Sequence, residues 1–279
     1  MKIALDPALI RNLPVAQSFH LAAKYGYDAV ELCARDDFAP SYGPVMATPE
    51  NKESVRKAAV AAGVELVSLA VFQTWSSPDE EKRLQAVARW KDVIQLAVDL
   101  ECPRINTELS GDPNLPTECR QAFLRSIGEL LPIIDAEGLT VAVEPHPWDF
   151  LETTDQALDL IDEVGSTSLR YLHCIPHSFH LGGSITEQIM RTSGKLDHIH
   201  LADSFKPGRT IVNPPGLDCR IHQHFDIGSG EIDWNEVTQA LNAVNFDGIA
   251  TVQVFFWEDR AEESIRVNRL AVDRILGIT

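Results

Sequence analysis

The sequence predicts a single (β/α)8 barrel, a TIM barrel, that spans residues 1–279 as one domain. Three observations lead to this prediction. Short apolar segments alternate with amphipathic stretches along the whole chain. The length of 279 residues suits a barrel of this type, which typically has about 250 residues. No linker divides the chain, and no GxGxxG follows the first apolar segment, as it would in a dinucleotide-binding sheet.

The predicted strands are eight short segments rich in apolar and β-branched residues. They are residues 2–5, 28–32, 65–72, 104–109, 139–144, 169–174, 196–201 and 249–255. Because helical stretches separate them, consecutive strands form parallel βαβ units. Eight such units favour a closed barrel over an open sheet.

Capping signals mark the helices between these strands. The stretch 76–100 has Ser77 before Pro78 and acidic residues in its first turn. The stretch 153–165 has Thr154 as its predicted N-cap and Gly165 as its stop, and another helix ends at Gly138. The alternation of strand and helix is therefore supported at the helix ends as well as by the apolar pattern.

Composition restricts the class of protein. Hydrophobic content of 44% and charged content of 23% are typical of a globular protein with an ample core. The net charge of −17 argues against binding the phosphate backbone of a nucleic acid. No signal peptide and no stretch of about 18 apolar residues is present, so no membrane contact is expected. The five scattered cysteines, without a CxxC, indicate reduced thiols and a cytoplasmic protein.

Polar residues gather where the predicted strands end, which is where barrels of this type build their active sites. They are Asp6, Glu31, Glu108, Glu144, His146, His177, His180, His198, His200, Asp203, Gln253 and Glu258. Eight of the nine histidines lie between His146 and His224. The long segment 202–232 follows the seventh strand, and loops of this length inside compact domains are usually functional.

Several segments resemble the sugar phosphate isomerase/epimerase superfamily of xylose isomerase-like TIM barrels. They are "VAVEPHP", the HxxH after the sixth strand, "DHIHLADS" and "DIGSGEIDW". The resemblance covers essentially the whole chain and extends to D-tagatose 3-epimerase and inosose dehydratase relatives. The segments "NTELSGDP", "IVNPPG", "RIHQHFDIGSGEIDW" and "TVQVFFWED" are most similar to the H-type branch of inositol catabolism.

The resemblance implies one divalent metal ion held by Glu144, His177, His200 and Gln253. The family has Asp where this chain has His177, and Glu where it has Gln253. The set therefore has one carboxylate instead of three, so Zn, Mn, Co or Fe is expected rather than Mg. An amide has no usable basicity, which leaves Glu144 and His180 as the expected catalytic pair. Glu258, Asp203 and Asp226 are alternative bases.

Each candidate also has a structural interpretation. His177 could be an ordinary loop histidine, one of the pair His198 and His200 a core histidine, and Gln253 a buried amide. His222 and His224 could form a rival metal pair. Salt bridges would account equally well for Glu31, Glu108 and Asp203. The residues expected to contact substrate are Glu108, Arg220, Gln253 and His222, and a guanidinium such as that of Arg220 suits a hydroxyl or phosphate.

We therefore expect a cytoplasmic, metal-dependent isomerase or epimerase that acts on a small sugar or cyclitol in carbohydrate metabolism, within inositol catabolism. It would transfer a proton next to a metal-polarised carbonyl. A dehydratase or hydrolase on the same scaffold, or a non-catalytic carbohydrate-binding barrel, is the alternative. A homodimer is left open, because Phe255, Phe256 and Trp257 suit either an interface or a pocket.

Overall fold

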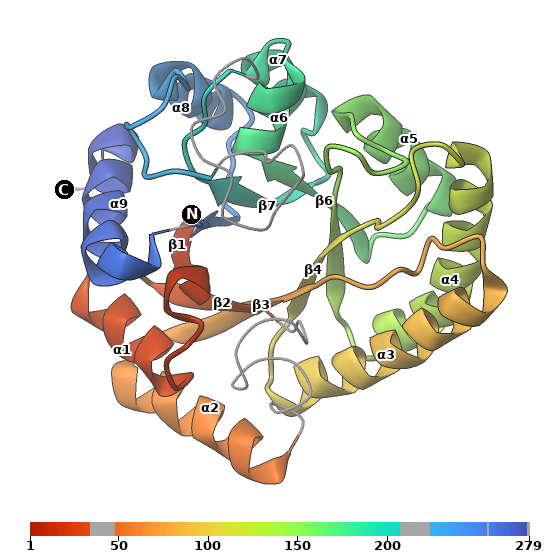
Figure 1. Ribbon diagram of the computed structural model, residues 1–279, viewed down its shortest axis with the longest axis horizontal. Coiled ribbons are helices and arrows are strands. Elements are labelled where there is room, and N and C mark those ends of the chain that lie inside the picture. The colour runs from red at the N-terminus through yellow and green to blue at the C-terminus, as the bar shows by residue number, and fades with distance from the viewer. Residues whose placement is uncertain (34–47, 207–223, 256, 278–279) are drawn as a thin grey trace.

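The computed structural model describes residues 1–33, 48–206, 224–255 and 257–277. Eight parallel strands close into a barrel in the order β1 to β8, with β1 paired to β8. Figure 1 looks down this barrel and shows the strands inside a ring of helices. The strands are β1 (Lys2–Leu5), β2 (Ala29–Cys33), β3 (Glu65–Val71), β4 (Arg104–Glu108), β5 (Thr140–Glu144), β6 (Leu169–Cys174), β7 (Leu196–Leu201) and β8 (Ile249–Val252). The predicted (β/α)8 fold is confirmed.

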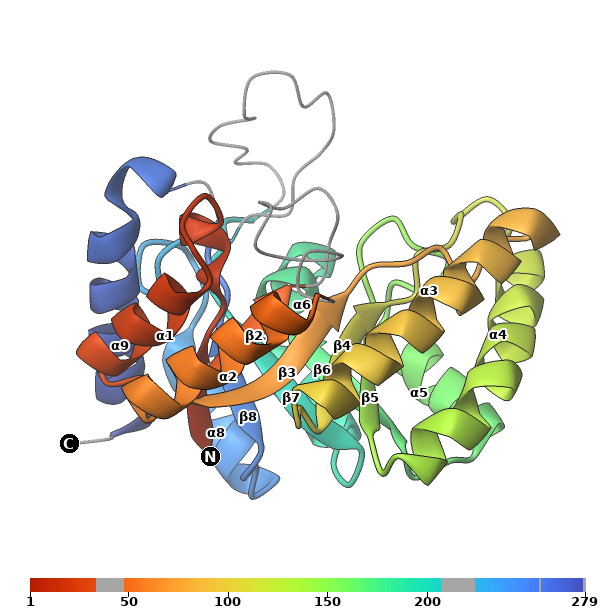
Figure 2. The same ribbon diagram turned by 90° about the horizontal axis from the view of Figure 1, so that it is seen from below.

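The helices pack around the outside of the strands, as the side view in Figure 2 shows. They are α1 (Ala16–Lys24), α2 (Pro49–Ala62), α3 (Glu80–Asp99), α4 (Pro116–Ala136), α5 (Thr154–Val164), α6 (Ile175–Leu181), α7 (Ile185–Arg191), α8 (Trp234–Ala243) and α9 (Ala261–Leu276). Two short 3-10 turns, η1 (Pro7–Ile10) and η3 (Glu258–Arg260), follow β1 and β8.

Two predicted N-caps are wrong by one or two residues. Helix α3 is capped by Asp79 rather than Ser77, because the Asp79 carboxylate accepts hydrogen bonds from the backbone N–H groups of Glu81 and Lys82. Helix α5 is capped by Thr153 rather than Thr154, in a capping box with Gln156. The Thr154 hydroxyl instead lies 3.0 Å from that of Tyr171.

Strand β8 is shorter than predicted. It ends at Val252, whereas the apolar run continues to residue 255. Beyond Val252 the chain stays extended, and the Phe255 backbone N–H bonds to the carbonyl of His224 instead of to a neighbouring barrel strand. Strand propensity therefore persists past the point where the barrel ladder stops.

The core has an apolar shell and a partly polar lumen. Between α3 and α4, the rings of Trp75 and Trp90 stack with centroids 4.4 Å apart. Small apolar residues fill the lumen at the amino end of the strands, namely Ala4, Ala29, Val67 and Ile249. Buried polar residues, including Glu31 and His200, take over toward the carboxyl ends. The buried polar residues of the candidate site therefore lie toward the end where barrels place their sites.

The segment after β6 is a short helix, so its histidines do not lie in an irregular loop. Helix α6 lies inward of α7, beside β6 and β7 (Figure 1). Pro176 is accommodated in its first turn, where no intrahelical N–H bond is needed. The positive φ values of Gly182 and Gly183 end the helix.

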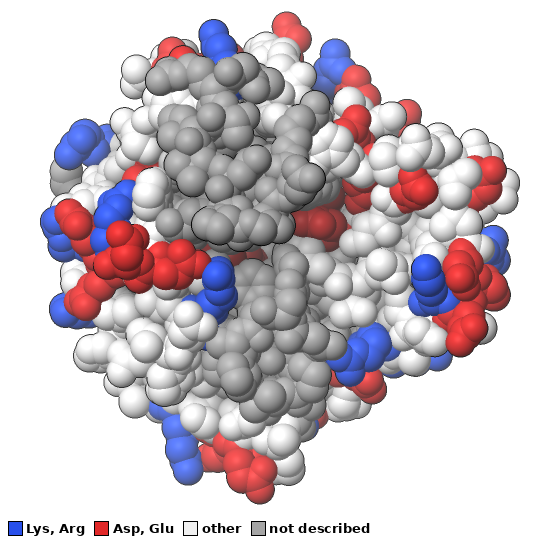
Figure 3. Space-filling model, viewed as in Figure 1, with Lys and Arg blue, Asp and Glu red and all other residues white. Residues whose placement is uncertain are grey.

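The surface agrees with the acidic composition. Figure 3 shows Asp and Glu side chains both at the rim and near the middle of the face viewed along the barrel. Among the described residues, no helix is long and apolar enough to cross a lipid bilayer.

Candidate metal centre

The carboxyl ends of four neighbouring strands bring possible ligands together. Glu108 on β4 pairs in register with Glu144 on β5, and Cys174 on β6 pairs with His200 on β7. Glu144, Cys174 and His200 are buried, whereas Glu108 is partly exposed. Strand register therefore places carboxylate, thiol and imidazole groups around one point of the barrel.

Two histidines converge on the buried carboxylate of Glu144. Its Oε1 lies 2.8 Å from Nδ1 of His177, and its Oε2 lies 3.2 Å from Nδ1 of His200. Neither approach has hydrogen-bond alignment, and Glu144 Oε1 and His200 Nδ1 have no hydrogen-bond partner among the described residues. Burial alone would raise the pKa of Glu144, but attraction to His200 and His177 lowers it well below its usual value. The carboxylate is therefore ionised.

His200 lies between two carboxylates. Its Nε2 lies 2.9 Å from Oε1 of Glu31, in a hydrogen bond, while Nδ1 faces Glu144. Burial would lower the pKa of this imidazole, but the charges of Glu144 and Glu31 raise it well above its usual value. Without a metal ion this raised pKa leaves a proton on each nitrogen, one toward Glu31 and one toward Glu144, and a metal ion bound at Nδ1 would displace the second. This carboxylate–histidine arrangement is the one that orients metal-binding imidazoles.

Glu31 is held in the lumen by several donors. Its Oε2 accepts hydrogen bonds from Ser68 Oγ, at 2.5 Å, and from Asn106 Nδ2. Desolvation would raise the pKa of Glu31, yet attraction to His200 and His198, with these hydrogen bonds, lowers it to about 2. Glu31 thus stays charged at any ordinary pH and positions His200.

His177 and His180 project from α6 three positions apart, on the same side of the helix. The His177 ring meets that of His146 edge-on, with centroids 4.5 Å apart, and the His180 ring meets that of Trp148 at 5.6 Å. Burial, the main cause, lowers the pKa of His177 to about 4. A neutral imidazole of this kind has an unprotonated nitrogen that can ligate a metal ion. Nε2 of His146 lies 3.6 Å from Oε1 of Glu108.

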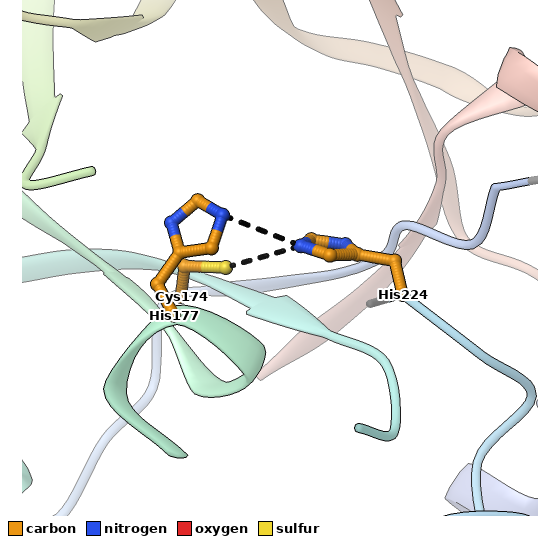
Figure 4. A group of neighbouring side chains, drawn as sticks. All are labelled: Cys174, His177 and His224. Carbon is orange, nitrogen blue, oxygen red and sulfur yellow. Dashed lines mark hydrogen bonds between the residues drawn. The ribbon is translucent and has the colours of Figure 1, made fainter. Parts of the chain in front are cut away.

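A second group of donors lies beside the first. Figure 4 shows Cys174, His177 and His224 pointing toward one another. Nε2 of His224 lies 3.7 Å from Cys174 Sγ and 3.4 Å from Nε2 of His177. Nδ1 of His224 lies 2.8 Å from the backbone carbonyl of Gln253, so this nitrogen carries the proton. Burial is the main cause that lowers the pKa of His224 well below its usual value, so Nε2 is the unprotonated nitrogen that faces Cys174 and His177.

The Gln253 side chain lies at the same end of the barrel, where its amide contacts Asp6. Its Nε2 donates to Oδ2 of Asp6 at 3.1 Å, so its Oε1 is the atom with which it could ligate. Burial and the nearby charge of Glu31 raise the pKa of Asp6 to about 7. Gln253 is thus both a buried amide and a neighbour of the centre.

The three alternative bases all have structural partners. Asp203 accepts hydrogen bonds from the backbone N–H groups of Ser204, Gly228 and Ile232 and from Trp234 Nε1, and so holds the segment before α8. Asp226 pairs with Arg260 and accepts from Ser264 and Asn268. Glu258 pairs with Arg11 at 2.7 Å. Arg220 and His222 lie outside the described residues.

Several residues near the centre were missed by sequence reasoning. Cys174 was considered only as a reduced thiol, although it ends a predicted strand. Trp148 follows β5 closely, and its positive φ, 71°, marks an unusual turn there, whereas His146 was already among the polar residues expected at the strand ends. Position at a strand end was the available signal for Cys174, but its pairing with His200 depends on register.

The donor set around Glu144 fits a divalent metal ion. It combines an ionised carboxylate with Nδ1 atoms of two imidazoles, and two of these donor atoms are buried without a hydrogen bond among the described residues. Buried polar atoms without partners are costly unless another group satisfies them. Mixed nitrogen and oxygen donors suit Zn, Mn, Co or Fe.

Comparisons with known proteins match the chain to one family and to several enzymes. Residues 19–270 match the family model of the xylose isomerase-like TIM barrel. An inosose isomerase from Bacillus velezensis is 22% identical over 99% of this chain and 98% of its own length. A D-psicose 3-epimerase from Enterocloster bolteae is 25% identical over 54% of this chain and 43% of its own.

Solved structures share the fold over nearly the whole chain. The crystal structure of the IolI protein with a bound zinc atom superposes with a TM-score of 0.82 at 19% identity, covering 99% of this chain and 98% of that one. That of a D-tagatose 3-epimerase-like protein has a TM-score of 0.77 at 18% identity, covering 99% and 98%. With the match over residues 19–270, the chain belongs to the family of xylose isomerase-like TIM barrels.

Proposed function

We propose that this protein is a metal-dependent isomerase or epimerase that moves a proton at the carbon next to a carbonyl of a sugar or cyclitol. The observation that carries the proposal is the buried, ionised Glu144 at the end of β5, approached by Nδ1 of both His177 and His200. The isomerase and epimerase relatives support the reaction class. The inosose isomerase supports a cyclitol substrate and a place in inositol catabolism.

Glu144, His177 and His200 would hold the metal ion, with the amide oxygen of Gln253 as the fourth ligand. A divalent ion bound there would act as a Lewis acid and polarise a carbonyl oxygen of the substrate. Glu31 keeps His200 in the required orientation through its hydrogen bond to Nε2. Asp6 orients the Gln253 amide in the same way.

The proton transfer would use Glu144 and His180. Glu144 is ionised, so its carboxylate accepts the proton of the substrate C–H bond while the electron pair moves toward the carbonyl carbon and forms an enediol. His180 gives a proton to the carbonyl oxygen. In isomerisation, Glu144 gives its proton to the former carbonyl carbon, and the enediol hydroxyl on the other carbon returns a proton to His180 as the new carbonyl forms. In epimerisation, a proton from solvent reaches the opposite face of the original carbon, the enediol hydroxyl returns its proton to His180, and Glu144 releases its proton to solvent.

Substrate hydroxyls would meet the partly exposed side of the centre. Glu108 accepts from a hydroxyl, next to His146, and Trp148 covers His180. Gln253 is a further contact. Arg220 and His222 stay predictions for substrate binding, because they lie outside the described residues.

The direct test is exchange of substrate protons with solvent. We would incubate the purified protein with zinc or manganese and a panel of inososes and ketohexoses in D2O, and follow deuterium incorporation by NMR. Glu144→Gln keeps the shape but cannot accept a proton, so we expect exchange to fall by about 100-fold or more. Glu163→Gln is the matched control, because Glu163 pairs with Arg120 on the surface.

The same panel separates the alternatives. A dehydratase would release water and a hydrolase would release hydrolysis products, the latter without exchange of carbon-bound protons. A carbohydrate-binding barrel would be stabilised by a sugar with neither turnover nor a need for metal. Any of these results, or full exchange in Glu144→Gln, would contradict the proposal.

A further inference from the structure

Cys174, His177 and His224 form a compact set of donors that the proposed proton transfer does not use as a unit. They come from three places in the chain: the end of β6, helix α6 and the segment before α8. Their ligating atoms lie within 4.8 Å of one another, and all three side chains are buried. Figure 4 shows the Cys174 thiol and the His177 ring both directed at Nε2 of His224.

The separations between these atoms match the edges of a tetrahedral zinc site. With Zn–N of about 2.0–2.1 Å and Zn–S of about 2.3 Å, N···N edges are about 3.3 Å and S···N edges about 3.6 Å. The two Nε2 atoms of His177 and His224 are 3.4 Å apart. Sγ of Cys174 is 3.7 Å from Nε2 of His224. Two of the three separations are therefore those of bound ligands, and the third is at most 4.8 Å.

Each imidazole is oriented by a contact on its other nitrogen. Nδ1 of His224 donates to the backbone carbonyl of Gln253 at 2.8 Å, and its ring stacks on that of Phe255 with centroids 4.8 Å apart. Nδ1 of His177 faces Oε1 of Glu144 at 2.8 Å. A carbonyl and a carboxylate behind the two rings are the partners that metal-binding histidines usually have.

We propose that Cys174, His177 and His224 form a site for a thiophilic divalent metal ion, of which Zn²⁺ is the best fit. His177 would serve it through Nε2, on the side of the ring away from Glu144. On binding, the Cys174 S–H bond breaks, its proton goes to solvent, and the sulfur electron pair forms the S–metal bond. A thiolate with two imidazoles prefers Zn²⁺ or Co²⁺ to Mg²⁺ or Mn²⁺. His177 is also a ligand of the ion proposed at Glu144, through Nδ1, so the two ions would be alternatives at this residue. The thiolate site does not depend on the isomerase reaction.

Cobalt(II) provides the test, because a thiolate ligand gives it a charge-transfer band in the near ultraviolet. We would titrate Co²⁺ into the metal-free full-length protein and measure this band, then measure zinc content by mass spectrometry after dialysis. The band should appear in the wild type and in Cys102→Ser, a buried thiol outside the site. It should be lost in Cys174→Ser, and His224→Gln should weaken cobalt binding by about 100-fold or more.

Glu144→Gln separates this proposal from the proposed reaction, because it should lose proton exchange and keep the thiolate band. If Cys174→Ser does not fold, the affinity of His224→Gln decides the question alone. Absence of the band in the cobalt-loaded wild type, its persistence in Cys174→Ser, or unchanged cobalt affinity in His224→Gln would overturn the site.

Discussion

Two neighbouring groups of buried polar residues contain similar residue types but differ in their hydrogen bonding. The inner cluster consists of Glu31, Ser68, Asn106, His198 and Thr251, and the rim cluster of Glu144, Cys174, His177 and His224. His200 connects them, with Nε2 on Glu31 and Nδ1 on Glu144. Both groups contain triads spaced for a metal ion.

The difference between the clusters lies in their hydrogen bonds. In the inner cluster, both oxygens of Glu31 accept hydrogen bonds, and Nε2 of His198 lies 2.7 Å from the Thr251 hydroxyl. In the rim cluster, Oε1 of Glu144 has a nitrogen 2.8 Å away and no hydrogen bond among the described residues. Ligand spacing therefore does not identify a metal site by itself. The inner cluster is not fully satisfied either, because Asn106 Oδ1 and His198 Nδ1 have no hydrogen-bond partner among the described residues. The clusters differ in their carboxylates, since both oxygens of Glu31 accept hydrogen bonds and Oε1 of Glu144 does not.

The largest expected difference is in folding stability. Glu31→Gln should lower the free energy of unfolding by about 3–5 kcal/mol, because it leaves buried donors facing an amide in place of a carboxylate. Glu144→Gln in metal-free protein should also be destabilising, because the attraction to His200 and His177 that lowers the pKa of Glu144 is lost. Its loss should be smaller, because Oε1 makes no hydrogen bond among the described residues and His200 keeps Glu31. Urea denaturation with a chelator present measures both. Equal losses would show that the rim cluster is as much a structural network as the inner one.

The pH dependence of stability should follow the inner carboxylate. The pKa of Glu31 is about 2 in the folded protein against a usual 4.5, so its contribution is full above about pH 4.5. As the pH falls from there toward 2, about 3 kcal/mol should be lost. Urea titrations across this range should show a shallower decline in Glu31→Gln. A decline as steep as that of the wild type would rule out the assigned role of Glu31.

Much of the fold was predictable because it depends on patterns local in sequence. Alternating apolar segments gave all eight strands, and errors such as the end of β8 arose where extended chain continues beyond the ladder. Glu144, His177 and His200 were predicted as one centre, and their contacts support that grouping. Cys174 was missed because its nearness to His200 and His224 depends on strand register and on a distant segment.

Metal binding should stabilise the protein through the rim cluster alone. Zinc at 100 times its dissociation constant should add about 2.7 kcal/mol to the free energy of unfolding. His177→Ala should remove most of this gain, because His177 contacts both Glu144 and His224. Thermal denaturation with zinc and with chelator measures it. If zinc stabilised both His177→Ala and His200→Ala as much as the wild type, neither histidine would be a zinc ligand.

The smallest expected effects come from two matched hydrogen bonds, one in each region. Thr251→Val removes the hydroxyl 2.7 Å from Nε2 of His198, and Ser178→Ala removes the hydroxyl 3.1 Å from Nε2 of His173. Each should cost about 1 kcal/mol, since each leaves one buried imidazole nitrogen without its partner. Only Ser178→Ala should also weaken zinc binding, because Ser178 anchors the helix that carries His177 to the end of β6. Zinc affinity lowered equally in Thr251→Val would mean that the two clusters act as one unit, joined through His200.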